Sequence, residues 1–324
     1  MKEITITTNK ISNMVNGHFH VWGWEVPLYL FLGGLTAGIL IIASVMAFRK
    51  KKDSFALSSG KLSLWAPFIL SLGMVSLFLD IKHKLFVWRF YTAFEITSPM
   101  SWGSWVLLMI YPLSFLLILA TIRESYPGIF SFINKFLSFL KLDILFRKLT
   151  EFSEENYKII AGITIPFAIT LGIYTGILLS AFGSRPFWNS SMLGPLFLVS
   201  GLSSAVAMVI LLSKEHKEKS LFTKVDIALL LTEGVFILLF LIGLATSSSQ
   251  YKAALTLVTG GALTSSFWIF IVMFGLFIPA LLEVLELKGR NINPKLAPVL
   301  VIAGGLFLRF IIVEAGQMNS WLPY

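Results

Sequence analysis

The side chains best suited to chemistry in this sequence are ionisable or phenolic groups set in long apolar stretches. Glu233 lies seven residues after Asp226, and Arg309 lies in another apolar run. Glu25 and Tyr29 are spaced i,i+4, which puts both on one face of a helix. A carboxylate accepts a proton, a phenol donates a hydrogen bond, and an arginine holds a carboxylate ionised or orients it. These residue types indicate proton handling in apolar surroundings.

The composition excludes several classes of protein. Of 324 residues, 56% are hydrophobic and only 13% are charged, and the mean hydropathy is +0.82. A soluble enzyme would need about twice that share of charge to cover its surface. The sequence has no cysteine, which excludes disulfides, iron–sulfur clusters, thiolate zinc sites and cysteine nucleophiles within it. The net charge of +9 fits a basic membrane face, so we expect no nucleic acid partner.

Long uncharged runs predict helices that span a membrane, each needing about 20 mostly apolar residues. We find eight, at about 25–48, 62–80, 102–122, 159–183, 191–212, 226–246, 266–285 and 297–315. None contains a histidine, since the four histidines are His18, His20, His83 and His216. We therefore expect no haem held within the spans and no metal site. The sequence predicts one all-α integral membrane domain over residues 1–324.

The positions of Lys and Arg predict the orientation. With the N-terminus outside, the inner loops hold 18 of them and the outer segments 7, so we expect both termini outside. The N-terminus has no apolar region typical of a cleavable signal peptide. The longest loop is then cytoplasmic, and its stretch at about 129–152 alternates apolar and charged residues. This pattern predicts an amphipathic helix that lies on the lipid surface, with partner docking as the alternative.

A faint internal repeat relates the two halves of the sequence. Tyr29–Gly38 in the first span is similar to Leu196–Ala205 in the fifth, and both carry small residues that let helices approach closely. Both spans would begin outside. The match suggests two parallel bundles of four helices.

Polar residues gather at the outer ends of the predicted spans, and this shared side points to one site. They are Glu25, Tyr29, Asp80, Tyr174, Arg185, Trp188, Asn189 and Gln317, with Arg309 in the outer half of the last span. Each has a plainer interpretation. Tryptophans near outer ends form aromatic belts, Asp80 could end a helix, and Arg309 could belong to a structural ion pair.

Asp226 and Glu233 lie in the part of the sixth predicted span that is nearer the cytoplasmic side. Glu233 lies about 10 Å past Asp226 at the 1.5 Å rise of an α-helix. Together they could mark a proton route from the cytoplasm. The alternative is a single hydrogen-bonded buried carboxyl.

Five segments in order resemble the NrfD/PsrC family, the membrane subunits of polysulfide-reductase-type complexes. They are Pro27–Gly38, Leu79–Asp80 followed by Trp88–Phe90, Thr97–Trp105, Arg185–Asn189 and Arg309–Gln317. With eight spans, the resemblance extends over essentially the whole sequence.

The resemblance implies a quinone-reactive anchor in the prokaryotic cytoplasmic membrane, with no redox cofactor of its own and menaquinone or another quinone as its substrate. Such subunits pair with a four-cluster ferredoxin-type iron–sulfur subunit, which usually connects to a molybdopterin catalytic subunit that sets the terminal substrate. The family's pocket tyrosine, eleven residues before the arginine of Arg-Pro-x-Trp-Asn, matches Tyr174. We expect Tyr174, Glu25 and Asp80 to be catalytic. We expect Tyr29, Arg185, Trp188, Asn189, Arg309 and Gln317 to bind the quinone.

A different class of protein also accounts for part of this pattern of polar residues. A secondary transporter would use the parallel repeat and the buried Arg309 and Glu233. Against it, the spans lack matching Gly/Pro-broken helices, and most polar residues lie near one face instead of the midplane.

Overall fold

Eight long helices build the protein, as the sequence predicts. The computed structural model describes residues 22–49, 55–290 and 293–319, and no strand occurs within these ranges. In this part of the protein, eight helices are long and apolar enough to cross a membrane. They form because a helix satisfies every backbone polar group internally, as the bilayer interior requires. The prediction of an all-α membrane protein with eight spanning helices is confirmed.

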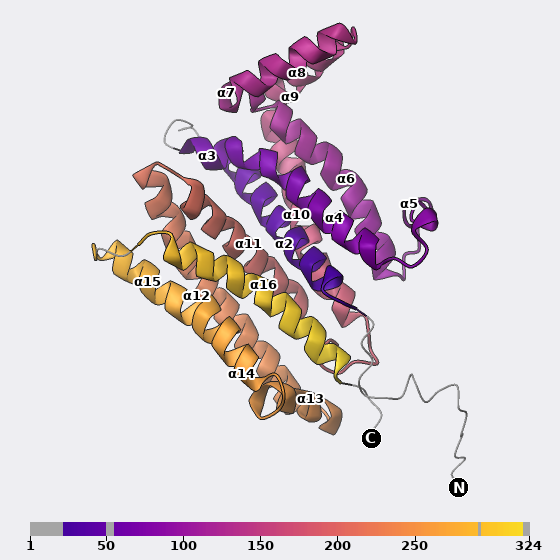
Figure 1. Cartoon of the computed structure of the whole chain (residues 1–324), viewed down its shortest axis with the longest axis vertical. Helices are drawn as coiled ribbons and strands as arrows, with labels where there is room; N and C mark the ends of the chain where they lie inside the picture. The colour runs from indigo at the N-terminus through magenta and orange to yellow at the C-terminus, as the bar shows by residue number, and fades with distance from the viewer. Residues whose placement is uncertain (1–21, 50–54, 291–292, 320–324) are drawn as a thin grey trace.

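Four spanning helices come from the first half of the sequence. These are α2 (Glu25–Ala47), η2 with α4 (Lys61–Leu64 and Trp65–Asp80), α6 (Pro99–Leu119) and α10 (Tyr157–Ser180), with short helices α3 (Ala56–Ser59), η3 (Lys84–Phe86), α5 (Arg89–Thr92) and α7 (Ile122–Ser125) between them. The second half contributes α11 (Leu193–Leu212), α12 (His216–Thr246), α14, η4 and α15 as one continuous span (Thr264–Ser266, Phe267–Phe277 and Ile278–Leu287) and α16 (Leu296–Gln317), with α13 (Ser249–Thr259) beside them. Figure 1 shows the two sets side by side.

Helix α12 starts ten residues before the predicted span at 226, because a charged segment beginning at His216 continues the same helix. His216 is therefore its first residue, and His83 lies in the loop after α4. His18 and His20 lie outside the described residues.

Helix α2 is central to the bundle. It packs against α4, α10, α11 and α16, and most of its side chains are buried. Its crossing with α11 depends on small residues: a Cβ atom added to Gly201 would lie 2.6 Å from the Gly34 carbonyl oxygen, and one added to Gly38 would lie 2.7 Å from Ala205 Cβ. These residues come from the two stretches of the predicted repeat. The repeat itself stays a prediction.

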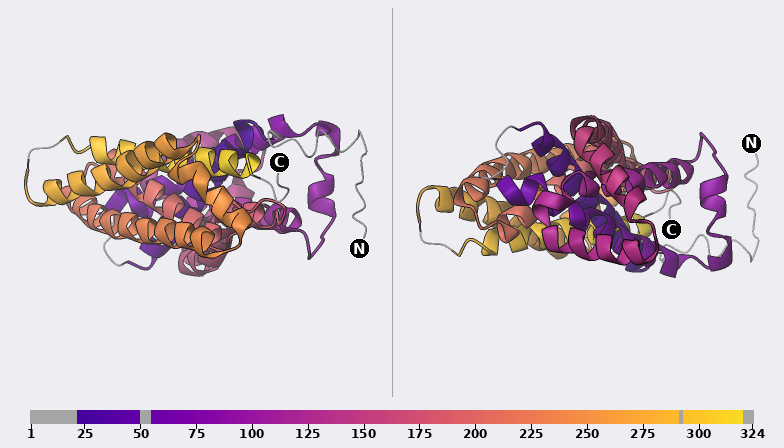
Figure 2. Two further views of the ribbon diagram at one scale, coloured as in Figure 1. Left: turned by 90° about the horizontal axis from the view of Figure 1, so that it is seen from below. Right: turned by 90° about the horizontal axis from the view of Figure 1, so that it is seen from above.

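The first and last described residues meet at one end of the bundle, which we call the terminal end (Figure 1). The Trp22 backbone N–H donates to Gln317 Oε1 at 2.9 Å, and Gln317 Nε2 donates back to the Trp22 carbonyl at 3.0 Å. The segment around α5 stands away from the bundle near this end, as the end-on views in Figure 2 also show.

The opposite end carries a helical hairpin, α8 (Pro127–Phe139) and α9 (Asp143–Glu155), and we call it the hairpin end. The sequence predicts a single amphipathic helix at 129–152. The structure has two helices, because the backbone turns at Lys141, whose φ of 57° lies outside the helical region. Phe132 and Phe139 are 73% and 86% exposed, so the hairpin presents an apolar face as the amphipathic pattern predicts.

Candidate functional site

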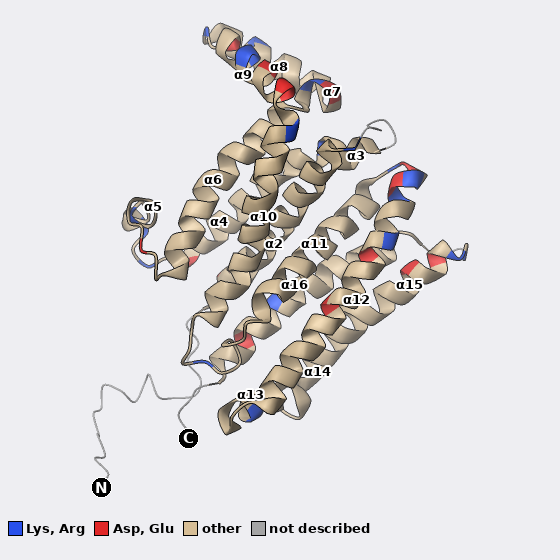
Figure 3. Ribbon diagram, turned by 180° about the vertical axis from the view of Figure 1, so that it is seen from behind, with Lys and Arg blue, Asp and Glu red and all other residues tan. Residues whose placement is uncertain are grey.

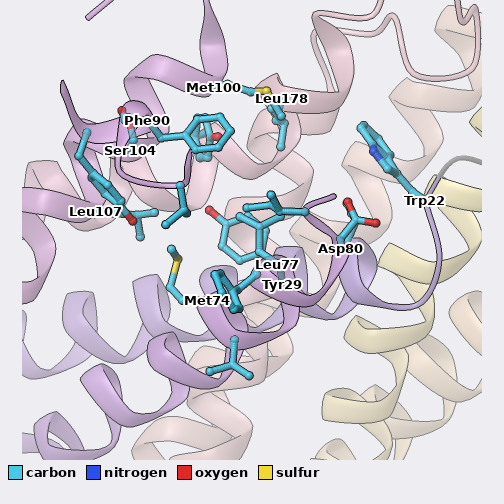
Figure 4. A pocket seen from close by; sticks show the side chains of 17 residues that line it. Trp22, Tyr29, Met74, Leu77, Asp80, Phe90, Met100, Ser104, Leu107 and Leu178 are labelled. Atoms are coloured by element: carbon cyan, nitrogen blue, oxygen red, sulfur yellow. The ribbon is translucent and has the colours of Figure 1, made fainter. Parts of the chain in front are cut away.

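A mostly apolar cavity of about 380 Å³ lies near the terminal end. Its walls come from α2, α4, α6, α10 and the segment around α5, and the labelled side chains in Figure 4 surround it. Among its apolar residues are Val26, Met74, Leu77, Leu107 and Leu178. A volume in this range, with few polar groups, is typical of sites for small organic ligands.

Two phenols from different helices face this cavity. Tyr29 on α2 and Tyr174 on α10 both line it, and their side chains are only 2% and 6% exposed. Both hydroxyls lie beside the cavity, and neither has a hydrogen-bond partner among the described residues. A buried hydroxyl normally finds a partner. Both phenols can therefore donate a hydrogen bond to a ligand in the cavity.

A glycine gives the Tyr174 ring its space. A Cβ atom on Gly103 of α6 would clash with the Cζ and hydroxyl of Tyr174, whereas one on Gly73 of α4 would lie 3.5 Å from Tyr29 Cδ2, at an ordinary van der Waals distance. Gly103 belongs to the predicted Thr97–Trp105 segment, but only the folded bundle reveals what its missing side chain makes room for.

The third expected residue on the cavity is Asp80. It is the last residue of α4, and its half-buried carboxyl lines the cavity. Glu25 does not line it: its backbone carbonyl accepts a 2.8 Å hydrogen bond from Ser76 Oγ, and its carboxylate lies close enough to Asp80 for charge repulsion. Of the expected catalytic residues, the structure brings Tyr174 and Asp80 onto the cavity and places Glu25 beside it.

Tyr91 and Ser104 also line the cavity, and the sequence analysis did not single them out. Tyr91 lies in α5, outside the spanning helices. Burial, followed by the nearby Tyr111 phenol, raises the pKa of Tyr91 above its ordinary value. Tyr91 is therefore a neutral hydrogen-bond donor at physiological pH. The only signal in the sequence was its place just after Trp88–Phe90.

The cavity also meets the outer surface of α4. Val75 and Phe78 line it and are 56% and 41% exposed. In a spanning helix, an exposed apolar side chain faces lipid. The cavity can therefore be reached from the side of the bundle.

Arg185 and Gln317 lie at the terminal end but not on this cavity. Arg185 Nη1 donates to the backbone carbonyls of Gln317 and Asn319 at 3.1 and 2.7 Å. Gln317 binds Trp22 through both atoms of its amide. These two side chains tie the loop after α10 and the N-terminal segment to the end of α16.

Trp188 and Asn189 make similar contacts within the protein. Trp188 Nε1 donates to the Ile312 carbonyl at 2.8 Å, and its ring fills the space left by Gly316. Its indole also stacks on Trp22, with ring centroids 5.1 Å apart. Asn189 Nδ2 donates to the Tyr251 hydroxyl of α13 at 2.9 Å. The structure thus places Arg185, Trp188, Asn189 and Gln317 in a network that joins segments and does not bring their side chains to the cavity.

Arg309 is fully buried in the middle of α16, away from the cavity. Its Nη1 donates to Ser200 Oγ at 2.5 Å and its Nη2 to the Phe197 carbonyl at 2.8 Å. The guanidinium carbon lies 4.7 Å from the centroid of the Phe197 ring. Ser200 also hydrogen-bonds to Glu233, which lies close enough to Arg309 for charge attraction. Ser200 therefore links Arg309 to Glu233 in the buried centre of the bundle.

Asp226 lies on the same helix as Glu233 and accepts a 2.6 Å hydrogen bond from Ser203 Oγ. No group of three or more histidine, aspartate or glutamate side chains able to hold a metal ion occurs in the described part of the protein.

Comparison with known proteins shows which family this protein resembles. The model of the family described as "Polysulphide reductase, NrfD" matches residues 11–320. A polysulfide reductase component of Wolinella succinogenes, designated C, is 28% identical, over 92% of this chain and 94% of that protein. Protein NrfD of Escherichia coli is 30% identical, over 93% of this chain and 97% of that protein. A selenate reductase component of Mesobacillus selenatarsenatis, also designated C, is 26% identical, over 90% of this chain and 73% of that protein.

A match this long, on a bundle whose eight spanning helices follow the predicted order, confirms the resemblance inferred from the five sequence segments. This protein belongs to the NrfD family.

Proposed function

We propose that this protein is the quinone-reactive membrane subunit of a respiratory oxidoreductase complex, and that it oxidises quinol in the cavity between Tyr29, Tyr174 and Asp80. The observation that carries the proposal is the pair of buried phenols on a mostly apolar cavity, neither of which has a hydrogen-bond partner among the described residues. A quinone ring has two carbonyl oxygens that accept hydrogen bonds, and an apolar body that fills such a cavity.

Quinol oxidation releases two electrons and two protons. Tyr174 and Tyr29 donate hydrogen bonds to the ring oxygens and fix the orientation of the ring, while Asp80 at the end of α4 accepts a proton as the hydroxyl loses it. We expect Glu25, which lies close to Asp80, to take that proton onward. Each proton then leaves toward the terminal end, and the electrons leave to an acceptor outside this chain.

The route for the lipid tail follows from the same cavity. Menaquinol and other membrane quinols carry a long apolar tail that stays in the bilayer. Val75 and Phe78, which both line the cavity and face outward, let the ring enter while the tail stays in lipid.

The acceptor we propose is a four-cluster ferredoxin-type iron–sulfur subunit that docks at the terminal end and passes electrons to a molybdopterin catalytic subunit. Two of the relatives are named as single components of larger reductases, one for polysulfide and one for selenate. The terminal end then faces the periplasm, in agreement with the Lys and Arg distribution of the sequence.

The test is a fluorescence titration of the purified protein in nanodiscs with a quinol-site inhibitor. Trp22 lines the cavity and reports binding. We expect saturable quenching, and about 3- to 10-fold weaker binding in Tyr174→Phe, because one neutral hydrogen bond contributes about 0.5–1.5 kcal/mol.

Tyr126→Phe is the matched control, since Tyr126 lies at the hairpin end, where its hydroxyl donates to the Lys61 carbonyl. Its affinity should equal that of the wild type. If the folded wild-type protein shows no saturable binding, alone or with its iron–sulfur partner, the quinone site is wrong and the transporter alternative takes its place. Equal weakening in both variants would overturn the role of Tyr174.

A further inference from the structure

Helices α12 and α15 bring two carboxyl groups together inside the second half of the bundle. Asp226 is 0% and Glu283 1% exposed, and the two side chains lie within hydrogen-bonding reach of each other. Charged positions on α12, α15 and α16 are visible within this half in Figure 3. Glu283 was not among the residues that the sequence analysis singled out.

Most oxygens of this pair have no donor within the described part of the protein. Ser203 Oγ donates to one oxygen of Asp226 at 2.6 Å. The other Asp226 oxygen and both Glu283 oxygens have no hydrogen-bond partner among the described residues. An ionised carboxylate only accepts hydrogen bonds, so two ionised groups side by side cannot satisfy each other. A proton on one of them supplies the missing donor and removes the repulsion between two buried like charges.

We propose that Asp226 and Glu283 hold one exchangeable proton between them and form the proton-loading site of a path that runs from the hairpin end toward Glu233. The ligand of this site is the proton itself. It moves as an acid–base exchange: the singly protonated pair takes up a proton at the hairpin end and then gives one to the Glu233 carboxylate, which returns the pair to its starting state.

Polar groups continue from the pair in both directions. Toward the hairpin end, half-buried Glu286 lies one turn of α15 beyond Glu283, within the electrostatic range of Lys219 and His216 at the start of α12. These groups connect the pair to the aqueous side.

Toward the centre, Glu233 lies two turns along α12 and close enough to Asp226 for charge repulsion. Beyond it, Ser200 links Glu233 to Arg309. Arg309 keeps one guanidinium nitrogen, Nε, without a partner among the described residues. The path thus reaches the bundle centre, where Arg309 lies beside Gly34 of α2, the helix that also carries Tyr29.

The protonated pair can be detected in this protein alone. Infrared spectra of the reconstituted protein should contain the carbonyl stretch of a protonated carboxylic acid at neutral pH, shifted in D₂O. We expect Glu283→Gln to remove this band, because glutamine keeps the shape and supplies an N–H donor to Asp226. Glu151→Gln is the control, since Glu151 is exposed and paired with Arg123, and it should leave the band unchanged.

Two results of this measurement would overturn the site. A wild-type spectrum without the protonated-acid band would mean that both carboxylates are ionised. A band that disappears on adding Na⁺ at constant pH would mean that the pair holds a metal cation instead of a proton.

The role of the path rests on the proposed function and is tested separately. In liposomes containing the full complex, Glu283→Gln should keep quinol oxidation and take up fewer protons per electron from the hairpin side than the wild type. An unchanged ratio would overturn the path. Absence of quinol oxidation in the wild type would instead overturn the proposed function, while the infrared result would still stand or fall by itself.

Discussion

The phenol of Tyr174 on α10 fills the space beside Gly103 on α6 that the Cβ atom of any other residue at position 103 would occupy. The ring can reach the cavity because α6 presents no Cβ atom there. One residue on a neighbouring helix thus determines where the proposed hydrogen-bond donor lies.

We expect Gly103→Ala to displace Tyr174 and to weaken inhibitor binding at least as much as Tyr174→Phe. Overpacking of this kind costs about 1–3 kcal/mol, which outweighs the gain of up to about 1 kcal/mol from replacing glycine by alanine within a helix. Thermal unfolding and inhibitor titration would measure both effects. Gly243→Ala, at a helix position with nothing within 4 Å, should raise stability slightly and leave binding unchanged. Unaltered affinity in Gly103→Ala would contradict the idea that Gly103 positions the phenol.

A second prediction separates the network at the terminal end from the cavity. Asn189→Ala removes the hydrogen bond to the Tyr251 hydroxyl and should cost about 1 kcal/mol of stability. The affinity of the cavity for the inhibitor should stay that of the wild type. Denaturation and titration of the same sample measure both. A large loss of affinity at unchanged stability would place Asn189 at the ligand, as the family resemblance implied.

Arg309 and Glu233 should behave as one unit. Removing one partner leaves the other charge buried and unpaired, so Arg309→Met alone should destabilise by about 3–5 kcal/mol. The double variant Arg309→Met/Glu233→Gln should recover part of that loss. A double-mutant cycle on thermal unfolding measures the coupling. Strictly additive effects would mean that the two groups do not pair.

The crossing of α2 and α11 should tolerate no side chain at Gly201. A Cβ atom there meets the backbone of Gly34, which cannot rotate away as a flexible group can. We expect Gly201→Ala to lower the unfolding temperature and the yield of folded protein. Gly234→Ala is the matched control, because Gly234 also lies within a spanning helix and has nothing within 4 Å. Equal yields and unfolding temperatures for both variants would show that the crossing relaxes easily.

The sequence predicted best the features that depend on a single continuous segment and its surroundings. Uncharged runs such as Val26–Phe48 predict spanning helices because the bilayer leaves the backbone no other way to satisfy its polar groups. The convergence of Tyr29, Asp80 and Tyr174 was predicted from their shared side of the membrane. The membrane topology determines how deep each residue lies in the bilayer. Three residues at similar depth on neighbouring helices can line one cavity.

The sequence did not reveal toward which neighbouring helix or segment each side chain points. Arg185 and Trp188 share the depth of the cavity, but their side chains turn toward backbone carbonyls of the C-terminal segment. Any backbone carbonyl can accept such a bond, so no pattern of residue types marks it beforehand. Tyr91 was missed for the related reason that α5, with only four residues, is too short to show a periodicity from which its facing side could be inferred.

The central place of α2 has a consequence for how this protein is made. Among the spanning helices of the described residues, α2 is the first in the sequence, yet it packs against α16, the last of them. Until α16 has packed against α2, the bond between Trp22 and Gln317 cannot form, because Gln317 is the last residue of α16. Assembly of the described bundle is therefore completed only when α16, the last of its helices in the sequence, packs against α2, the first of its spanning helices.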